Sequence, residues 1–266
     1  MNRIGALSLI LTSCVVLLMA CGTKAPAGSA GSNPPAPGFN LAGSDAKAVA
    51  LADEVMTALG GRKAWDETRY IRWNFFGRRS LLWDKTKGRV RIEMPDEKTT
   101  ILLNIADQTG QVERMGVALT EPDSLKKYLE QGRRIWINDS YWLVMPYKMK
   151  DSGVTLKYLG EGKTEAGDPS DMLELTFANV GVTPQNKYHI HVRKSDHLMT
   201  QWSFFGNYSD EKPRFTNPWA NYQRCGAILL SGDRGGDRKL TDVAVFKKVP
   251  ESAFTSLNAL DLRLLQ

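Results

Sequence analysis

Three histidines, His189, His191 and His197, come nearest in type and spacing to a metal site in this chain of 266 residues. His189 and His191 are two positions apart, so in a strand they share one face. A loop over residues 194–196 would bring His197 to the same face. However, no cysteine or supporting carboxylate completes a ligand set. We therefore expect exposed strand histidines without a metal, and a surface metal site is the alternative.

The motifs of common enzymes are missing from the sequence. There is no GxSxG, no HExxH, no P-loop, and no GxGxxG after a predicted strand. Acidic residues are scattered over predicted polar strand faces and turns, so no pair of carboxylates is marked as an acid and a base. The sequence therefore favours a binding protein over an enzyme, and it predicts no cofactor.

Cys21 has the best-defined chemistry. A single Arg3 precedes an apolar run over residues 4–19, and residues 18–21 (LMAC) resemble the bacterial lipobox. This predicts a lipoprotein signal peptide over residues 1–20 and acyl chains such as palmitate on Cys21. An ordinary cleaved leader or an uncleaved anchor is the alternative. By resemblance to lipoproteins of two-membrane bacteria, Gly22 implies an outer-membrane anchor with the domain facing the periplasm.

The rest of the chain is predicted to be one tethered domain. Residues 21–44 are rich in Gly, Ser, Ala and Pro, which is typical of a flexible linker. Residues 45–266 are enough for a single domain with a sizeable core. Cys225 is the only cysteine in that range, and we expect it to be a small buried side chain.

The formal charge is +6, and residues 61–100 are its most basic region. These charges alternate with acidic residues, which favours solvated strand faces. Contact with anionic lipid head groups is the alternative. A nucleic-acid partner is not expected, because the predicted export signal is accompanied by no nucleic-acid-binding motif.

Nearly the same aromatic pentapeptide occurs twice, as WNFFG over Trp73–Gly77 and as WSFFG over Trp202–Gly206. The alternation of a strand would place the Trp and the first Phe of each segment on one face. We expect both segments in one curved sheet with those rings on its concave side, and Phe76 and Phe205 on its convex side. A plain core and a ligand-lined pocket remain equal alternatives for these rings.

Two helices and many strands are expected to position these residues. Apolar residues at helical spacing over residues 48–59 predict a helix with Ser44 as its N-cap. A capping signal at Thr120 begins a second helix that runs to Trp136. Nearly everything else alternates with period two, which predicts about ten or eleven antiparallel strands. Tyr141–Tyr147 is among them, as a strand that is apolar on both faces.

Residues 60–79, 141–162 and 187–205 together resemble envelope lipoproteins of the superfamily of the lipoprotein carrier LolA and its receptor LolB. The resemblance implies a mainly β (α+β) domain, in which a strongly curved antiparallel sheet forms a half-open β-barrel with two helices on its concave side. It also implies that the concavity holds acyl chains.

We therefore predict a membrane-anchored periplasmic lipoprotein that binds an acyl chain or another lipid-like ligand, with a role in lipoprotein or lipid handling at the outer membrane. The alternative is an envelope sensor or accessory protein whose barrel is filled by its own side chains and which binds a protein partner. The predicted cavity lining consists of apolar and aromatic side chains on expected inward positions: Trp73, Phe75, Trp83, Leu103, Trp142, Tyr158, Phe177, Trp202 and Phe204.

Overall fold

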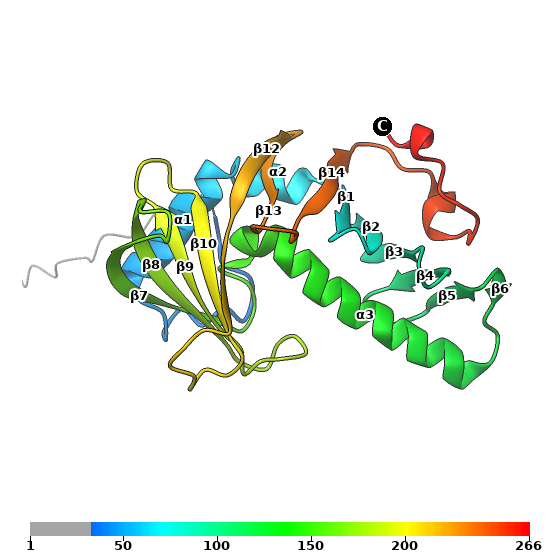
Figure 1. The fold of residues 1–266 in the computed structure, drawn as a ribbon, viewed down its shortest axis with the longest axis horizontal. Coiled ribbons are helices and arrows are strands. Elements are labelled where there is room, and N and C mark those ends of the chain that lie inside the picture. Colours follow the sequence, from blue (N-terminus) through cyan, green and yellow to red (C-terminus); the bar gives the residue numbers. More distant parts are fainter. Residues whose placement is uncertain (1–32) are drawn as a thin grey trace, which may run out of the picture. The chain divides into compact units, whose positions relative to one another are not determined.

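Fourteen β-strands and three α-helices build residues 33–266, the part of the chain that this computed structural model describes (Figure 1). The strands are β1 (Tyr70–Phe75), β2 (Arg79–Asp84), β3 (Arg89–Met94), β4 (Thr99–Asn104), β5 (Gly110–Arg114), β6 (Val117–Ala118), β7 (Val154–Lys163), β8 (Pro169–Phe177), β9 (Lys187–Arg193), β10 (Met199–Phe205), β11 (Phe215–Pro218), β12 (Ala220–Cys225), β13 (Ile228–Asp233) and β14 (Leu240–Phe246). The helices are α1 (Ala46–Ala58), α2 (Arg62–Glu67) and α3 (Pro122–Val144), with 3-10 turns η1 (Met145–Lys148), η2 (Glu251–Phe254) and η3 (Leu262–Leu264). The predicted signal peptide, Cys21 and the first half of the linker lie outside the described residues.

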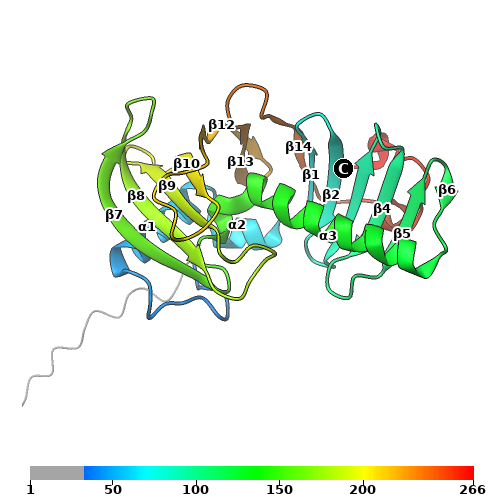
Figure 2. The ribbon, with the colours of Figure 1, turned by 60° about the horizontal axis from the view of Figure 1, so that its bottom comes forward.

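All the strand pairs are antiparallel, and they form three sheets (Figure 2). The seven-stranded sheet has the order β14-β1-β2-β3-β4-β5-β6, the five-stranded sheet has the order β11-β10-β9-β8-β7, and β12 pairs with β13. The two larger sheets are curved, and within residues 33–266 neither closes into a barrel. The predicted fold class is thus confirmed. More strands are present than predicted, in part because β6 and β11 have only two and four residues, too few to show a period.

Both predicted helices are present, with shifted starts. Helix α1 begins after Asp45, and the hydroxyl of Ser44 instead accepts a hydrogen bond from the amide of Leu156 at 3.0 Å. Helix α3 is capped by Glu121, whose carboxylate accepts from the amides of Asp123 and Ser124 at 3.0 and 2.7 Å. An acidic cap is favoured there because it lies at the positive end of the helix dipole.

The predicted strand over Tyr141–Tyr147 is wrong, because α3 continues to Val144 and the 3-10 turn η1 follows. Ser140, Leu143 and Val144 are buried on the same helix that already buries Leu129. A run that is apolar on all sides fits a buried helix end as well as a buried strand. Pro146 then stops the α-helix, since it has no amide hydrogen and restricts the residue before it.

Helix α3 packs closely on one face of the seven-stranded sheet (Figure 2). At Gly132, a Cβ atom would lie only 3.0 Å from a methyl carbon of Ile101, so the helix and the sheet are in close contact there. Helix α1 contacts β7 of the five-stranded sheet and η1. Residues of both sheets and both helices share one hydrophobic core.

The folded unit begins earlier than the predicted boundary at residue 45. The amide of Ala36 donates to the carbonyl of Lys150 at 2.9 Å, and the amide of Asn40 donates to the carbonyl of Val154 at 3.0 Å. The side chain of Phe39 packs against the core. Residues 33–44 therefore lie along the domain and cover part of the outer edge of β7.

The C-terminal segment covers the other face of the seven-stranded sheet. Ala253 and Phe254 pack with Tyr70 and Leu82 in a second, smaller core. Beside it, the buried guanidinium of Arg91 donates to the backbone carbonyls of Ser256 and Asn258 at 2.8 and 2.7 Å. None of the helices in residues 33–266 is long and apolar enough to cross a membrane.

Candidate functional site

The two aromatic pentapeptides lie in different sheets, so their predicted placement in one sheet is wrong. WNFFG ends β1 of the seven-stranded sheet, whereas WSFFG ends β10 of the five-stranded sheet. Each strand already has two neighbours in its own sheet, which leaves no free edge through which the two could join. Both tryptophans nevertheless face the common core, with Trp73 0% and Trp202 1% exposed.

The predicted parity of β10 is confirmed, although not through the predicted loop. Trp202 is opposite Ile190 and Phe204 is opposite Tyr188. Val192 is opposite Met199, so an even number of residues, 193–198, lies between these paired positions, and a β-bulge at Thr200 supplies the odd residue. Bulges re-aim side chains and often lie beside functional sites.

Trp142 joins the two pentapeptides. It projects from the end of α3, and its ring centroid lies 4.9 Å from that of Trp202 and 5.2 Å from that of Phe76, with both pairs edge to face. Phe215 of β11 lies 5.6 Å from Trp142. These contacts belong to what we call the aromatic cluster, which consists of Phe75, Phe76, Tyr141, Trp142, Phe177, Tyr188, Trp202, Phe204 and Phe215.

The predicted placement of Phe76 on the convex side of the sheet is wrong, because Phe76 lies in the turn between β1 and β2. Its φ is +55°, a left-handed conformation that is strained for a bulky residue. This conformation places its ring on that of Phe75, with centroids 4.0 Å apart, and against Trp142. Packing within the aromatic cluster therefore compensates for the backbone strain.

Only some of the predicted lining residues come together. Phe75, Trp142, Phe177, Trp202 and Phe204 belong to the aromatic cluster. Trp83 packs instead against Trp136, with ring centroids 5.5 Å apart. Leu103 is buried in β4. Tyr158 donates a hydrogen bond to the carboxylate of Asp171 at 2.7 Å, and Lys47 lies over its ring.

The predicted lining omits four residues of the aromatic cluster: Phe76, Tyr141, Phe215 and, at the centre of the cluster, Tyr188. The ring of Tyr188 is stacked on Trp202 at 5.3 Å and also contacts Tyr141, Phe177 and Phe204. Burial raises the pKa of its hydroxyl to about 12. Its alternation with Ile190 marks it as inward-facing, so the pattern was sufficient to include it. Because the rings pack against one another and leave no room for a ligand between them, we interpret the aromatic cluster as a filled core.

The three histidines have separate partners. His189 lies 3.0 Å from a carboxylate oxygen of Glu174, and His197 lies 3.1 Å from one of Glu54. The imidazole of His191 shares a hydrogen bond of 2.9 Å with the hydroxyl of Ser170. Within residues 33–266, no group of three or more His, Cys, Asp or Glu residues could hold a metal ion.

His191 is buried, so its predicted exposure is wrong. The turn between β7 and β8 folds over this face of the sheet, where the amide of Glu165 donates to the side-chain oxygen of Gln201 at 2.7 Å. Gln201 is opposite His191 in the sheet. Burial lowers the pKa of His191, and the neighbouring His189 lowers it further. Alternation cannot reveal a turn that covers the polar face of its own sheet.

A groove of about 450 Å³ opens beside this turn. Its walls come from the β7–β8 turn, the end of β9, the start of β10, and the connection from β11 to β12. The lining residues are Thr164, Glu165, Ala166, Asp168, Arg193, Leu198, Thr200, Gln201, Pro218, Trp219, Ala220, Asn221 and Tyr222. None of the predicted lining residues is among them.

The floor of the groove is mainly apolar and is firmly held. Trp219 is 1% exposed and meets Trp202 edge to face, with ring centroids 5.2 Å apart. The guanidinium of Arg234 lies 3.3 Å from the ring centroid of Trp219 and donates to the backbone carbonyls of Trp142 and Ser231. The hydroxyl of Tyr222 donates to the carbonyl of Met199 at 2.9 Å. The groove walls are thus fixed by the same core that the aromatic cluster fills.

Two polar atoms of the groove lining have no hydrogen-bond partner within residues 33–266. They are the indole nitrogen of Trp219 and the hydroxyl oxygen of Thr200. A buried polar group without a partner is costly, so such groups commonly meet a water molecule or a ligand. The sequence could not have signalled this site, because the segment around Trp219 shows no alternation and follows a proline.

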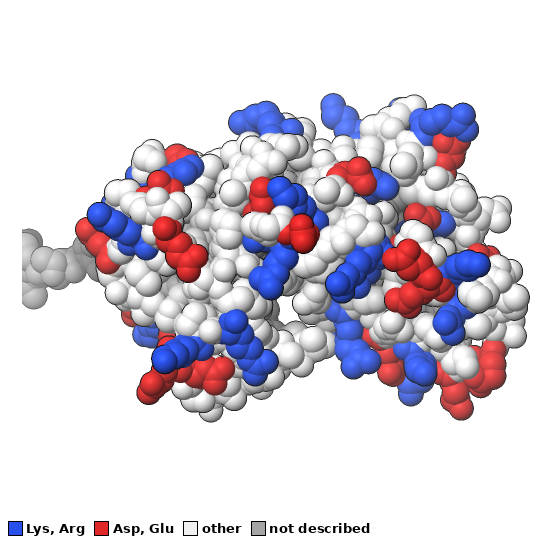
Figure 3. Space-filling model, viewed as in Figure 1, with Lys and Arg blue, Asp and Glu red and all other residues white. Residues whose placement is uncertain are grey.

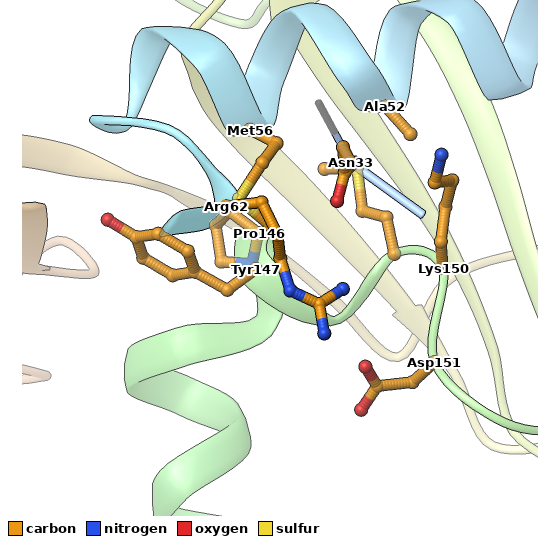
Figure 4. A pocket seen from close by; sticks show the side chains of 9 residues that line it. Asn33, Ala52, Met56, Arg62, Pro146, Tyr147, Lys150 and Asp151 are labelled. Carbon is orange, nitrogen blue, oxygen red and sulfur yellow. The ribbon is translucent and has the colours of Figure 1, made fainter. Parts of the chain in front are cut away.

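A second, much smaller cavity of about 10 Å³ lies between α1, η1 and the segment that begins at Asn33 (Figure 4). Arg62 donates to the carbonyl of Pro34 at 3.0 Å, and Asn33 donates to the carboxylate of Asp53 at 2.7 Å. A space of this size holds at most about one water molecule. The hydrogen bonds around this cavity hold the start of the folded unit in place.

The surface shows both signs of charge. In Figure 3, Lys and Arg side chains alternate with Asp and Glu side chains over the visible face. Within the basic region, Arg69 and Arg89 both bind the buried carboxylate of Asp84, at 3.0 and 3.1 Å. The expected solvated strand faces therefore include structural ion pairs.

No protein-family model matches the chain, and neither does any curated protein. Among solved structures, the chain is similar to a DUF1329 family protein of Desulfovibrio piger, at 11% identity and a TM-score of 0.40, over 82% of this chain and 99% of that one. It is similar to the MucA/MucB complex of Pseudomonas aeruginosa, at 16% identity and a TM-score of 0.24, over 68% and 62%. It is also similar to a LolA superfamily protein of Nitrosomonas europaea, at 12% identity and a TM-score of 0.38, over 78% and 97%.

Proposed function

We propose that this protein is a membrane-tethered envelope protein that binds the apolar chain of a lipid-like ligand in the groove beside Trp219. Cys21 with its acyl chains supplies the anchor, and the outer membrane is the proposed location, with the domain facing the periplasm. The role is binding rather than catalysis.

The groove itself carries the proposal. Its volume of about 450 Å³ is within the usual range of roughly 300–1,000 Å³ for small-molecule sites. Leu198, Pro218 and Tyr222 supply apolar surface, and the buried ring of Trp219 supports them from behind. Burial of an aliphatic chain there would contribute about 25 cal/mol per Å² of apolar surface removed from water.

This places the ligand outside the aromatic cluster in which the sequence predicted it. Trp73 and Trp202 are at most 1% exposed and serve as core. An acyl chain among the cluster rings would have to displace side chains that pack at centroid distances of 4.9–5.3 Å. The groove requires no such displacement.

The neutral fluorescent probe 1-N-phenylnaphthylamine tests the proposal. Ala166 is exposed and lines the groove, so Ala166→Trp should fill the groove without disturbing the core. Ala118 is an equally small, exposed residue on β6, and Ala118→Trp is the matched control. We expect the wild type and the control to enhance the probe fluorescence, and Ala166→Trp to lose most of the enhancement. Equal enhancement in all three would rule out the groove.

A second candidate is an envelope accessory protein that acts through a surface contact. The β5–β6 hairpin favours it, because Met115 in its turn and Val117 at the start of β6 are 66% and 65% exposed. A photo-crosslinking residue at position 115 should then give a discrete adduct in cells, whereas the same residue at the exposed position 211 should not. Absence of any adduct at position 115 would count against this candidate.

A further inference from the structure

The charges around the groove are unevenly distributed. Three charged side chains line it: Glu165, Asp168 and Arg193. The guanidinium of Arg193 donates to both carboxylate oxygens of Asp196, at 3.0 and 2.6 Å. Its remaining amino group lies 3.8 Å from Asp168. One guanidinium is thus shared by two carboxylates, and Asp196 already takes two of its hydrogen bonds.

The other acidic groups at the rim are accessible. Glu165 is exposed and has no ion pair within residues 33–266, and the side chain of Asp168 is 44% exposed. Lys194, the next residue after Arg193, is bound to Glu161 at 2.6 Å and does not line the groove. The rim therefore presents uncompensated negative charge beside an apolar floor.

The buried Arg234 does not reverse this sign at the rim. It lies over the ring of Trp219 but does not line the groove. Its hydrogen bonds go to the carbonyls of Trp142, Ser231 and Asp233 and to the hydroxyl of Ser231. Carbonyl dipoles therefore hold its charge within the fold, and burial lowers its pKa to about 9.

We propose that the groove binds a single-chain amphiphile whose polar end carries an ammonium group. The inference rests on the proposed function and specifies its ligand class. The aliphatic chain lies against Leu198, Pro218 and Tyr222, while the ammonium group meets Glu165 and Asp168 at the rim. A volume of about 450 Å³ is near the lower end for ligand sites, which suits one chain rather than two. A fatty acid would instead bring its carboxylate toward like charges.

Calorimetric titration with dodecylammonium and dodecanoate, at pH 7 and below their micelle concentrations, tests this ligand class. The chains are identical, so the comparison isolates the sign of the head group. The protein is residues 21–266 with Cys21→Ala, which keeps the whole chain after the predicted signal peptide. We expect dodecylammonium to bind about tenfold more tightly, because two partly exposed ion pairs together contribute about 1.4 kcal/mol.

The variant Glu165→Gln/Asp168→Asn should bring the two affinities close together. The control Asp96→Asn/Glu130→Gln makes the same change in net charge at exposed positions away from the groove and should keep the preference. Raising the salt concentration should weaken the preference in the wild type, since exposed charges are screened.

The possible failures are distinguishable. Equal binding of both amphiphiles, or tighter binding of dodecanoate, would overturn the ammonium preference while the groove remains a ligand site. A preference that persists in Glu165→Gln/Asp168→Asn would also overturn it. If neither amphiphile binds, and the neutral probe does not bind, the proposed function fails together with the inference.

A further comparison distinguishes two kinds of ligand that carry an ammonium group. A lysophosphatidylethanolamine brings a phosphate beside its ammonium group, and a long-chain amine does not. If the amine binds at least as tightly as the lysophospholipid, the ammonium group and the chain are sufficient for recognition. If only the lysophospholipid binds, the phosphate is required, and recognition by the ammonium group alone is overturned.

Discussion

The ring of Trp142, at the end of α3, stands edge-on against the ring of Trp202 in β10, with their centroids 4.9 Å apart. Helix α3 covers the seven-stranded sheet, and through this contact it also packs against the five-stranded sheet. Trp202 in turn meets Trp219 at 5.2 Å, and Trp219 lines the groove. The filled core and the candidate ligand site are therefore connected through edge-to-face aromatic contacts. Each can be tested separately.

Trp202→Ala should lower the free energy of unfolding by about 3–5 kcal/mol, because it removes a buried indole and leaves a cavity. Urea denaturation followed by circular dichroism measures the loss. Binding of the neutral probe, measured where the variant is still folded, should persist. A small loss of stability together with a loss of probe binding would return the ligand to the aromatic cluster.

Arg79 and Asp139 tie β2 to α3 through two hydrogen bonds of 2.6 and 2.8 Å. Asp139 is fully buried, and burial raises its pKa while the guanidinium opposes the increase. Arg79→Leu leaves this carboxylate uncompensated and should cost about 3–5 kcal/mol of stability. The double variant Arg79→Leu/Asp139→Leu should recover much of it. A double variant no more stable than Arg79→Leu would show that the hydrogen bonds, rather than the buried charge, dominate.

His191 should make the fold sensitive to mild acid. Its pKa is lowered in the folded state, so the unfolded chain binds the proton more readily. The stability that comes from neutral His191 is present above about pH 6.5 and is lost as the pH falls toward the lowered pKa. His191→Asn should therefore lose less stability than the wild type between pH 7.5 and pH 5. His197→Asn, at an exposed turn, should follow the wild type. Parallel profiles for all three would contradict the assignment.

Arg91 should hold the C-terminal segment on the sheet. Its guanidinium donates to the carbonyls of Ser256 and Asn258, and Arg91→Ala leaves these without their donor. We expect faster proteolysis and faster amide exchange over residues 255–266, with the seven-stranded sheet intact. Lys98→Ala, at an exposed turn of the same sheet, is the control. Unchanged protection of the segment would mean that Phe254 and its small core hold it alone.

The predicted anchor is tested by Cys21→Ala, which removes the thiol that would be acylated. We expect the protein to move from the membrane fraction to the soluble envelope fraction. If it stays with the membrane, an uncleaved apolar leader over residues 4–19 becomes the better explanation.

The sequence alone determined the fold class and most of its elements. Alternation at positions such as Ile71, Trp73 and Phe75 reports directly which face of a strand is buried, because the side-chain period of a strand is two. Helical spacing likewise predicted α1, because the side-chain period of a helix is 3.6 residues. A capping signal predicted the start of α3. The parity of Trp202 with Ile190 and of Phe204 with Tyr188 was likewise present in the pattern.

Only the tertiary structure decided which surfaces meet. Period alone does not distinguish a buried helix end from a strand, so Tyr141–Tyr147 was assigned to the wrong element. Nor does it show whether inward rings leave a cavity, because that depends on how Trp142, Tyr188 and Trp202 pack across elements. The groove is formed by a turn, a β-bulge at Thr200 and the strand connection at Trp219, where no period exists. Its position depends on long-range packing that brings these segments together, and such packing has no local signature in the chain.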